Sequence, residues 1–466
     1  MTYSSLLFIY GFLPVSLVIY WITPSKLKNI SLLILSIVFC TVNSLRFLEF
    51  MVICTLINYL DGILIDRLRS RKIIPEIMLF TGITFNVIVF FMFRTDFLDI
   101  FKDRLKIPDT FFPVGVSFVT LTAISYITDI YRKCIRAETD IIKFSLYMMM
   151  FPAIIMRPVI RYNTFRRMLN DRKITVSEAG TGLKIFVKGL TEKVIAGDTM
   201  YMLYTAVRSV DIWEMSALNA WLGMTAYMLS LYFTLSGMAD MGKGIGYCFG
   251  FRFPNCFNYP VFSNSIKDFY YNWNIQVVYW FRRYIARPLY EICGSRIYRK
   301  IIFIAVWCCI GMWYRFDING LIFGGIIGLT VISERYIRKF RLLKITGIIY
   351  TYVITIICMV FLSGENINYS VNYLLVLLGG SKMFADSMTL YIFKYYIVFL
   401  LIFIYCTTSL FRNMIMRSGN DYIIKAIAVI SPVVTILMLI LCTALISYTG
   451  SSEFYLTGLQ ERSFFP

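Results

Sequence analysis

The chain has 466 residues, 58% of them hydrophobic, and its mean hydropathy is +0.69. Soluble domains average about 45–50% apolar residues, so the composition excludes a soluble protein and indicates a polytopic membrane protein. The formal net charge is +19, from 46 Lys and Arg against 27 Asp and Glu. In so hydrophobic a chain, this excess is typical of basic loops held on the cytoplasmic side, facing anionic lipid, and does not indicate a nucleic-acid partner.

Histidine is absent from the whole sequence. No imidazole can therefore act as a general base, a metal ligand or a pH switch. The eleven cysteines are scattered without a CxxC pair, a pattern that predicts neither a disulfide framework nor a metal site.

Apolar stretches of roughly membrane length recur along the chain. The first, at 6–22, lacks the basic start and small-residue cleavage site of a signal peptide, so we expect a retained helix. The others lie at 29–43, 47–65, 76–93, 111–131, 141–157, 183–205, 219–237, 299–314, 318–333, 345–362, 388–410 and 423–448. We expect an all-α, multi-pass plasma-membrane protein of about 11 transmembrane helices plus re-entrant or short helices, forming one domain over 1–466.

The segment 249–289 differs from these stretches. It is more polar, it contains Pro254, Pro260 and Pro288, and six aromatic residues lie between Phe269 and Phe281. Irregular backbone at membrane depth persists only where protein or a water-filled cavity satisfies its peptide groups. We therefore expect this segment to line a central chamber.

Several segments together resemble the membrane-bound O-acyltransferase family, most closely the branch of the alginate O-acetyltransferase membrane component and the D-alanyl transfer protein of teichoic acid. They include GLTEKVIAGDT and SGMADMGKGIGYCFGFRFPNCFNYP, and their order and spacing follow the family over nearly the whole chain. The matching segments lie at 111–133, 151–165, 189–199, 236–290, 311–325 and in the tail 450–466.

The resemblance implies a tunnel that admits an acyl donor from the cytoplasm and an acceptor from the other face. The implied donor is acyl-CoA, such as acetyl-CoA, with no bound cofactor and no metal. The implied acceptor is a polysaccharide or cell-wall polymer, and the implied partners are the lipid bilayer and an extracytoplasmic acyltransferase or esterase-like protein.

The sequence departs from the family pattern where the family handles protons. The "WRRWHISLS"-like segment reads YYNWNIQVVYWFRRY, with Asn274 at the histidine position. The "GLWHGxxWNFxxWG" segment reads GMWYRFDINGLIFGG, with Tyr314 at the second histidine position, and "FFRA" reads FLSG, with Ser363 at the basic position. Framework residues of the first segment match, Trp273, Trp280 and Arg282 among them.

The candidate catalytic residues are therefore Asn274, Tyr314 and Asp317. Asn274 has no titratable proton, so it can orient a hydroxyl but not deprotonate one. Tyr314 titrates near ~10 when unperturbed, and Asp317 is either its proton acceptor, three residues away, or the ion-pair partner of Arg315. The expected chamber residues are Asp240, Asp268, Tyr271, Trp273, Gln276, Trp280, Arg282 and Trp313.

Four of these candidates, and the neighbouring Tyr270, have a structural reading beside the functional one. Asp240 is an ionisable residue at membrane depth, or it pairs with Lys243. Asp268 faces the chamber, or it caps the short helix that follows. Tyr270, Tyr271 and Trp273 stack on a sugar, or they are packing residues.

Three functions remain open from the sequence. The first is an O-acyltransferase with altered site residues that acts in cell-surface polysaccharide acylation. The second is a catalytically degenerate member that serves as a scaffold or conduit for a partner transferase. The third is a transporter or flippase for a lipid-linked substrate.

Overall fold

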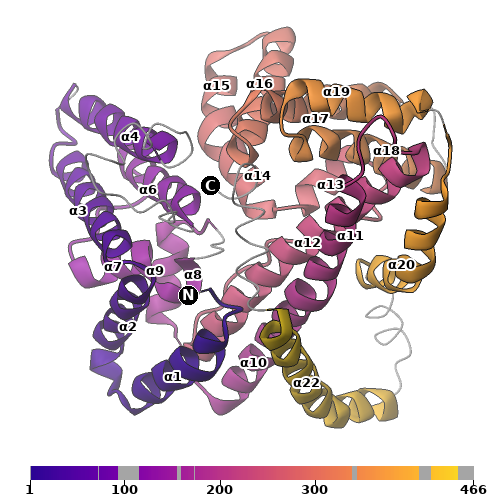
Figure 1. Ribbon diagram of the computed structural model, residues 1–466. Helices are drawn as coiled ribbons and strands as arrows, with labels where there is room; N and C mark the ends of the chain where they lie inside the picture. The colour runs from indigo at the N-terminus through magenta and orange to yellow at the C-terminus, as the bar shows by residue number, and fades with distance from the viewer. Residues whose placement is uncertain are drawn as a thin grey trace. The chain divides into compact units, whose positions relative to one another are not determined.

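A computed structural model of the protein describes residues 2–71, 73–92, 115–154, 159–172, 174–337, 344–381, 383–408 and 421–449. These residues form helices and connections without a strand, as the sequence predicts (Figure 1). They belong to two compact units, which are described separately. Unit 1 comprises Met1–Phe186 and Ala239–Pro254, and unit 2 comprises Val187–Met238 and Asn255–Phe464.

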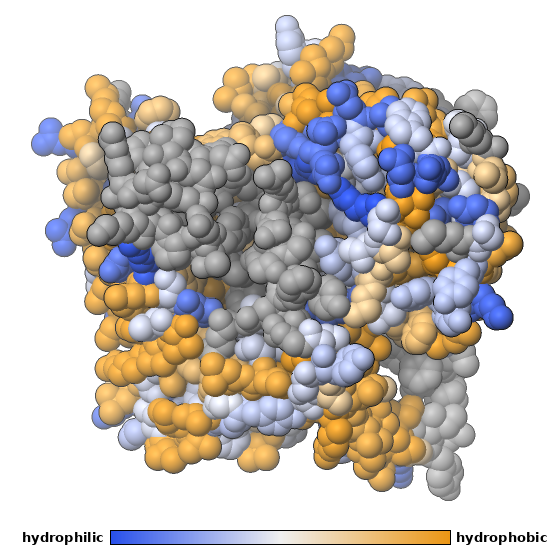
Figure 2. All heavy atoms as spheres, viewed as in Figure 1, coloured by the Kyte–Doolittle hydropathy of each residue, from blue (hydrophilic) through white to orange (hydrophobic). Residues whose placement is uncertain are grey.

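Eight of the described helices are long and apolar enough to cross a membrane. Their bounds are Ser25–Asn43, Leu45–Arg67, Ile74–Met92, Arg296–Tyr314, Ile318–Tyr336, Ile345–Ser363, Thr389–Cys406 and Lys425–Thr449. Each matches a predicted stretch, and shorter apolar helices cover Leu7–Ile22, Val116–Tyr131 and Ile367–Gly380. Apolar side chains cover much of the visible surface (Figure 2), as lipid-facing helices require. Residues 111–114, 155–158 and 450–466 of the predicted segments lie outside the described residues.

Unit 1 is built on consecutive N-terminal helices. They are α1 (Leu13–Ile22), α2 (Lys28–Asn43), α3 (Leu45–Arg67), α4 (Ile74–Met92), α6 (Val116–Tyr131), α7 (Ile141–Met149), α8 (Phe151–Ile154) and α9 (Tyr162–Asn170). The predicted span at 141–157 is wrong as one continuous helix, because the backbone becomes extended at Met150 between α7 and α8.

Polar pairs satisfy one another inside unit 1. The side-chain amides of Asn58 on α3 and Asn86 on α4 exchange hydrogen bonds of 2.8 and 3.3 Å. The buried carboxylate of Asp129 accepts a 3.0 Å bond from Arg161. A buried polar group is costly unless it is paired, so these pairs help to specify how the helices pack.

Unit 2 contains the remaining helices and parts of two helices that it shares with unit 1. Helix α10 (Val176–Thr191) continues through a π-helical turn, Glu192–Gly197, into α11 (Asp198–Arg208), and α12 (Ala217–Cys248) is 32 residues long. After the irregular stretch come α13 (Ile266–Asn272), α14 (Ile275–Phe281), a π-helical turn Arg282–Ala286, α15 (Arg287–Ile292), α16 (Arg296–Tyr314), α17 (Ile318–Ile337), α18 (Lys344–Ser363), α19 (Ile367–Leu375), a π-helical turn Val376–Gly380, α20 (Ser387–Cys406) and α22 (Asp421–Thr449).

Helices α16 and α17 form a tightly packed hairpin, which glycines allow. A Cβ added at Gly311 would overlap the carbonyl oxygen of Gly320, and one added at Gly324 would overlap that of Trp307. Small residues that let backbones approach closely are a main source of helix association in lipid. The hairpin therefore forms a rigid wall within unit 2.

The short helix α13 runs along this wall. The carboxylate of Glu334, near the end of α17, accepts the backbone N–H of Ile266 at 2.6 Å, so α13 begins beside the basic end of the hairpin. The chain after α13 then approaches Tyr314, at the opposite end of α16. Within unit 2, the predicted chamber segment thus consists of short helices separated by non-helical backbone.

The hairpin contact predicts that Gly324→Ala destabilises the protein by about 1–3 kcal/mol, because the new methyl group would force α16 and α17 apart. The measurement is the melting temperature of the detergent-purified protein. Gly325→Ala is the matched control, because a Cβ at Gly325 meets only the Cys308 sulfur, at 3.8 Å. Equal losses for both variants would contradict the close-contact explanation.

Candidate functional site

The candidate site lies at a break between two short helices of unit 2. The Ser265 hydroxyl caps α13 by accepting the backbone N–H of Asp268 at 3.0 Å, and α13 ends at Asn272. Asn274 then adopts left-handed backbone angles, φ 60° and ψ 62°, immediately before α14. Asparagine is one of the few residues that tolerate this conformation, so Asn274 suits the break.

Neighbouring backbone satisfies the peptide groups around the break. The Asn258 N–H donates to the Asn272 carbonyl at 3.0 Å, and the Ile275 N–H donates to the Cys256 carbonyl at 2.8 Å. The Gln276 side chain donates to the Asn255 carbonyl at 3.3 Å. The irregular stretch 255–258 therefore supports the site, as expected for non-helical backbone within a membrane protein.

The side chain of Asn274 makes no capping bond to α14. The Tyr314 hydroxyl instead interacts with two side chains, the amide of Asn274 and the indole N–H of Trp273. All three residues are buried, with 3%, 3% and 7% exposure for Trp273, Asn274 and Tyr314. The structure thus brings together Asn274 and Tyr314, two predicted site residues that are 40 residues apart in the sequence.

Aromatic rings surround this triad. Trp273 stacks on Phe269, with centroids 5.3 Å apart, and also contacts Tyr232. The centroid of the Tyr314 ring lies 6.0 Å from that of Phe323 and 5.1 Å from that of Trp313. Because these walls are apolar, a hydrogen bond made within them is electrostatically stronger than the same bond in water.

Tyr270 extends this aromatic wall toward α16 and α18. Its ring lies 5.9 Å from those of both Trp307 and Phe323. Its hydroxyl lies beside Thr355 and Cys358 of α18. Tyr270 is one of the aromatic residues for which the sequence left sugar stacking and packing open, and the structure gives it packing contacts with these rings.

The other predicted chamber residues of unit 2 are farther out. Tyr271 is half-buried against Trp307. Burial raises the pKa of the Tyr271 hydroxyl, and the cationic side chains of Arg282 and Arg335 oppose that rise. Arg282 is exposed, whereas Trp280 is buried and packs on Phe281 and Tyr284.

The three predicted aspartates have different surroundings. Asp317 pairs with Arg315 at 2.6 Å and accepts the Gly320 N–H at 2.9 Å at the start of α17. Of the two predicted roles of Asp317, the structure therefore shows the ion pair with Arg315. The N-cap of α13 is Ser265 rather than Asp268, because the Ser265 side chain accepts the bond. Asp240 belongs to the part of α12 that lies in unit 1.

Comparison with known proteins decides the family. The sequence profile of "MBOAT, membrane-bound O-acyltransferase family" matches residues 115–371, more than half of the chain. The chain belongs to the membrane-bound O-acyltransferase family. It is 30% identical to "Probable alginate O-acetylase AlgI" of Pseudomonas aeruginosa, over 79% of this chain and 73% of that protein.

Two further family members are similar over different lengths. A peptidoglycan O-acetyltransferase of Helicobacter pylori is 24% identical over 81% of this chain and 80% of that protein. A teichoic acid D-alanyltransferase of Bacillus subtilis is 26% identical over 37% of this chain and 44% of that protein. The site segment 265–314 and the turn after α18 both lie within the residues that the family profile matches.

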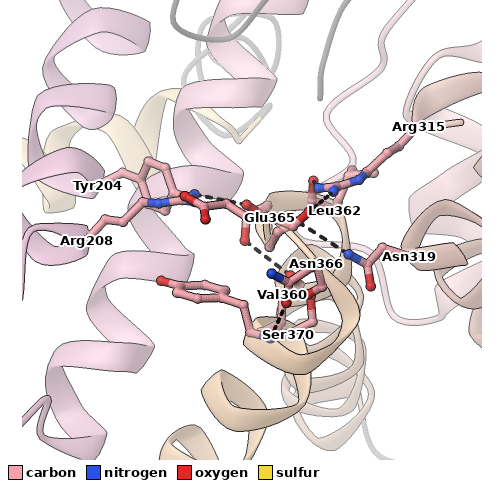
Figure 3. A network of polar contacts seen from close by, with 12 residues as sticks. Tyr204, Arg208, Arg315, Asn319, Val360, Leu362, Glu365, Asn366 and Ser370 are labelled. Atoms are coloured by element: carbon pink, nitrogen blue, oxygen red, sulfur yellow. Dashed lines mark hydrogen bonds and ion pairs between the residues drawn. The ribbon is translucent and has the colours of Figure 1, made fainter. Parts of the chain in front are cut away.

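A polar network beside the site was not predicted from the sequence (Figure 3). It joins Arg208 of α11, Arg315 after α16 and Asn319 of α17 to the turn between α18 and α19. The available signal was Arg315 itself, a charged residue directly after Tyr314 within an apolar segment. Its partners lie far away in the sequence, so spacing does not identify them.

Tyr314→Phe should destabilise the protein by about 1–3 kcal/mol, because it removes the acceptor for the buried N–H groups of Trp273 and Asn274. Chemical denaturation in detergent, followed by tryptophan fluorescence, measures the loss. Tyr279→Phe is the control, since Tyr279 lies on α14, directly after the break at Asn274, but is 43% exposed. A Tyr314→Phe variant as stable as this control would contradict the hydrogen-bonded triad.

Proposed function

We propose that this protein is a membrane O-acyltransferase that transfers an acetyl or other small acyl group from a cytoplasmic thioester donor to a cell-surface polysaccharide or cell-wall polymer. The observation that carries the proposal is the buried contact of Asn274, Tyr314 and Trp273. The relatives named for alginate and peptidoglycan acetylation make these two polymers the first acceptors to test. Acetyl-CoA is the first donor.

The chemistry of the triad favours donation of hydrogen bonds over removal of protons. An indole N–H can only donate, so Trp273 donates to the Tyr314 oxygen, and the Asn274 amide, whose N–H groups can also donate, contacts the same hydroxyl. With donors on its oxygen, Tyr314 retains its own proton to donate. Such a preorganised donor suits the oxyanion that develops in acyl transfer, where removal of one donor costs about 10²–10³ in rate.

In the transfer, a C–O and an S–H bond form while a C–S and an O–H bond break. The acceptor hydroxyl oxygen attacks the thioester carbonyl carbon, the C–S bond breaks, and the hydroxyl proton ends on the leaving sulfur. Tyr314 would stabilise the carbonyl oxygen, and Asn274 would orient Tyr314. Lack of a general base costs about 10²–10⁴ in rate, so we expect a slow enzyme.

The basic residues of the α16–α17 hairpin support an orientation of the hairpin across the membrane. Basic residues lie at the start of α16, at Arg296, Arg299 and Lys300, and near the end of α17, at Arg335. The positive-inside rule assigns that end to the cytoplasm. The turn at 315–317 then faces outward, so donor and acceptor would approach the triad from opposite ends of the hairpin.

A scaffold for a partner transferase is the second candidate. The observation that favours it is Asn274 at the family histidine position, in a chain without histidine. An amide cannot take up the proton that the reaction releases from the hydroxyl. In this reading, the fold positions a partner or conducts a substrate, and the partner performs the transfer.

The activity test uses proteoliposomes, labelled acetyl-CoA outside, and the acceptor polymer inside. We expect slow labelling of the polymer, and we expect Asn274→Gly to lower it at least tenfold, because glycine keeps the left-handed backbone but removes the amide. Labelling unaffected by Asn274→Gly would overturn the proposed site. A lack of labelling would favour the scaffold, and transport of substrate without acyl transfer would indicate a transporter.

Asn274→His should introduce a pH dependence. An imidazole near its ordinary pKa of about 6.5 is a base only when neutral, so the rate of acyl transfer should rise as pH increases through that range. The gain over the parent should reach about 10²–10⁴. The parent, which has no histidine, should lack this inflection, and an identical pH profile for both proteins would exclude position 274 from proton transfer.

A further inference from the structure

The turn between α18 and α19 is held by side chains from other helices (Figure 3). The carbonyl oxygens of four successive residues, 362 to 365, each accept a side-chain hydrogen bond. Arg315 donates to Leu362 at 3.1 Å and to Glu365 at 2.9 Å. Arg208 donates to Ser363 at 2.9 Å, and Asn319 donates to Gly364 at 3.3 Å.

Arg315 is the more buried of the two arginines, with 5% of its surface exposed. Its Nε also donates to Asp317 at 2.6 Å, so one guanidinium joins the start of α17 to the end of α18. A buried charge is tolerated only when it is paired and hydrogen-bonded, and a planar guanidinium fixes several acceptors in one geometry. The backbone at residue 315 is therefore held from two sides.

That backbone directly follows Tyr314. The Arg315 N–H closes the last turn of α16 by donating to the Gly311 carbonyl at 2.9 Å. A Cβ added at Gly320 would overlap the Arg315 carbonyl oxygen, so α17 packs directly on this residue. Any rotation of residue 315 would consequently move the Tyr314 hydroxyl relative to Asn274.

The sequence shows a matching exchange at two positions. Arg315 stands where the quoted pattern "GLWHG" has glycine, and Ser363 stands where "FFRA" has arginine. In the structure, the Arg315 guanidinium binds the carbonyls of residues 362 and 365, on either side of Ser363. Position 315, in the α16–α17 turn, thus supplies a guanidinium to the turn that contains position 363.

We propose that Arg315 is a positioning residue that holds Tyr314 against Asn274 and that it replaces, from the α16–α17 turn, a guanidinium that the family pattern carries at position 363. This inference deepens the proposed function, because it concerns the same site. It also explains the serine at position 363 and the arginine at position 315 together, because one guanidinium takes the place of the other. Substitutions that accumulate independently after a loss of function would not be expected to compensate each other in this way.

Arg208 provides a matched comparison. Its guanidinium also binds the turn and pairs with Glu365 at 2.9 Å, and it donates to the Tyr204 hydroxyl at 2.5 Å. It comes from α11, however, and is not adjacent to Tyr314 in the chain. If general stability of the turn were all that mattered, Arg208 and Arg315 would have equal effects on the site.

The test places 3-fluorotyrosine at position 314 and follows its ¹⁹F resonance in the detergent-purified, folded protein. We expect Arg315→Lys to shift or broaden this resonance, because a lysine cannot reach Asp317 and two carbonyls together. Arg208→Lys should leave it nearly unchanged. If both variants are folded, an unmoved resonance in Arg315→Lys, or equal effects of the two, would overturn the proposal.

An exchange of the arginine gives a second, independent test. Arg315→Gly should lower the melting temperature and displace the ¹⁹F resonance, and Ser363→Arg alone should also perturb the protein by crowding two guanidinium groups. In the double variant, the decrease in melting temperature and the displacement of the ¹⁹F resonance should each be less than half of those in Arg315→Gly, since coupled sites are non-additive. Purely additive effects would overturn the exchange.

Acyl transfer provides a final measurement that separates this inference from the proposed function. If the parent transfers acetyl groups, Arg315→Lys should lower kcat by up to about 100-fold, the effect of a misplaced reacting group, with a smaller change in KM. If the parent has no transfer activity, the proposed function fails, while the ¹⁹F experiments still decide whether Arg315 positions Tyr314.

Discussion

Helix ends inside a membrane protein leave carbonyl groups that need hydrogen-bond partners, and in unit 2 this requirement connects four helices. At the end of α18, side chains from α11, the α16–α17 turn and α17 supply those partners. A buried carbonyl group left without a partner would cost about 1–3 kcal/mol. The same bonds that satisfy the turn therefore determine where α16 ends, and with it the position of Tyr314.

The candidate site follows from a second backbone requirement. The chain must turn between α13 and α14, and the left-handed residue at this turn is Asn274. An asparagine meets that conformational demand and also presents an amide to Tyr314. A single residue thus has a structural role and a chemical one, so substitutions at position 274 must separate backbone strain from loss of the amide.

The contact between Asn274 and Tyr314 changes how the two residues are interpreted. Taken separately, an asparagine and a tyrosine are poor general bases. In contact, they form a buried polar pair within aromatic walls. The proposed function uses this pair to donate hydrogen bonds to developing negative charge, which is a narrower role than general acid–base catalysis.

Much of this protein could be predicted from its sequence. Long apolar runs predicted the helices, because the bilayer thickness sets their length, and the order of motifs predicted the family. Asn274 and Tyr314 were predicted as site positions from motif letters alone. The break at Met150 was not predicted, because apolar residues continue through it and hydropathy carries no information on backbone direction.

The sequence by itself thus determined the membrane class, the family and the absence of an imidazole. Only the tertiary structure decided that residues 274 and 314 meet, that Asp317 pairs with Arg315, and that Arg315 binds the turn after α18. The physical reason is that residues 274 and 314, and Arg315 and its partners in the turn, lie 40 to 50 residues apart in the sequence. The pair of Arg315 and Asp317 is local, and only packing decided between it and the alternative contact of Asp317 with Tyr314. Which side chains converge there depends on close packing of glycine-lined helices and on the pairing of buried polar groups.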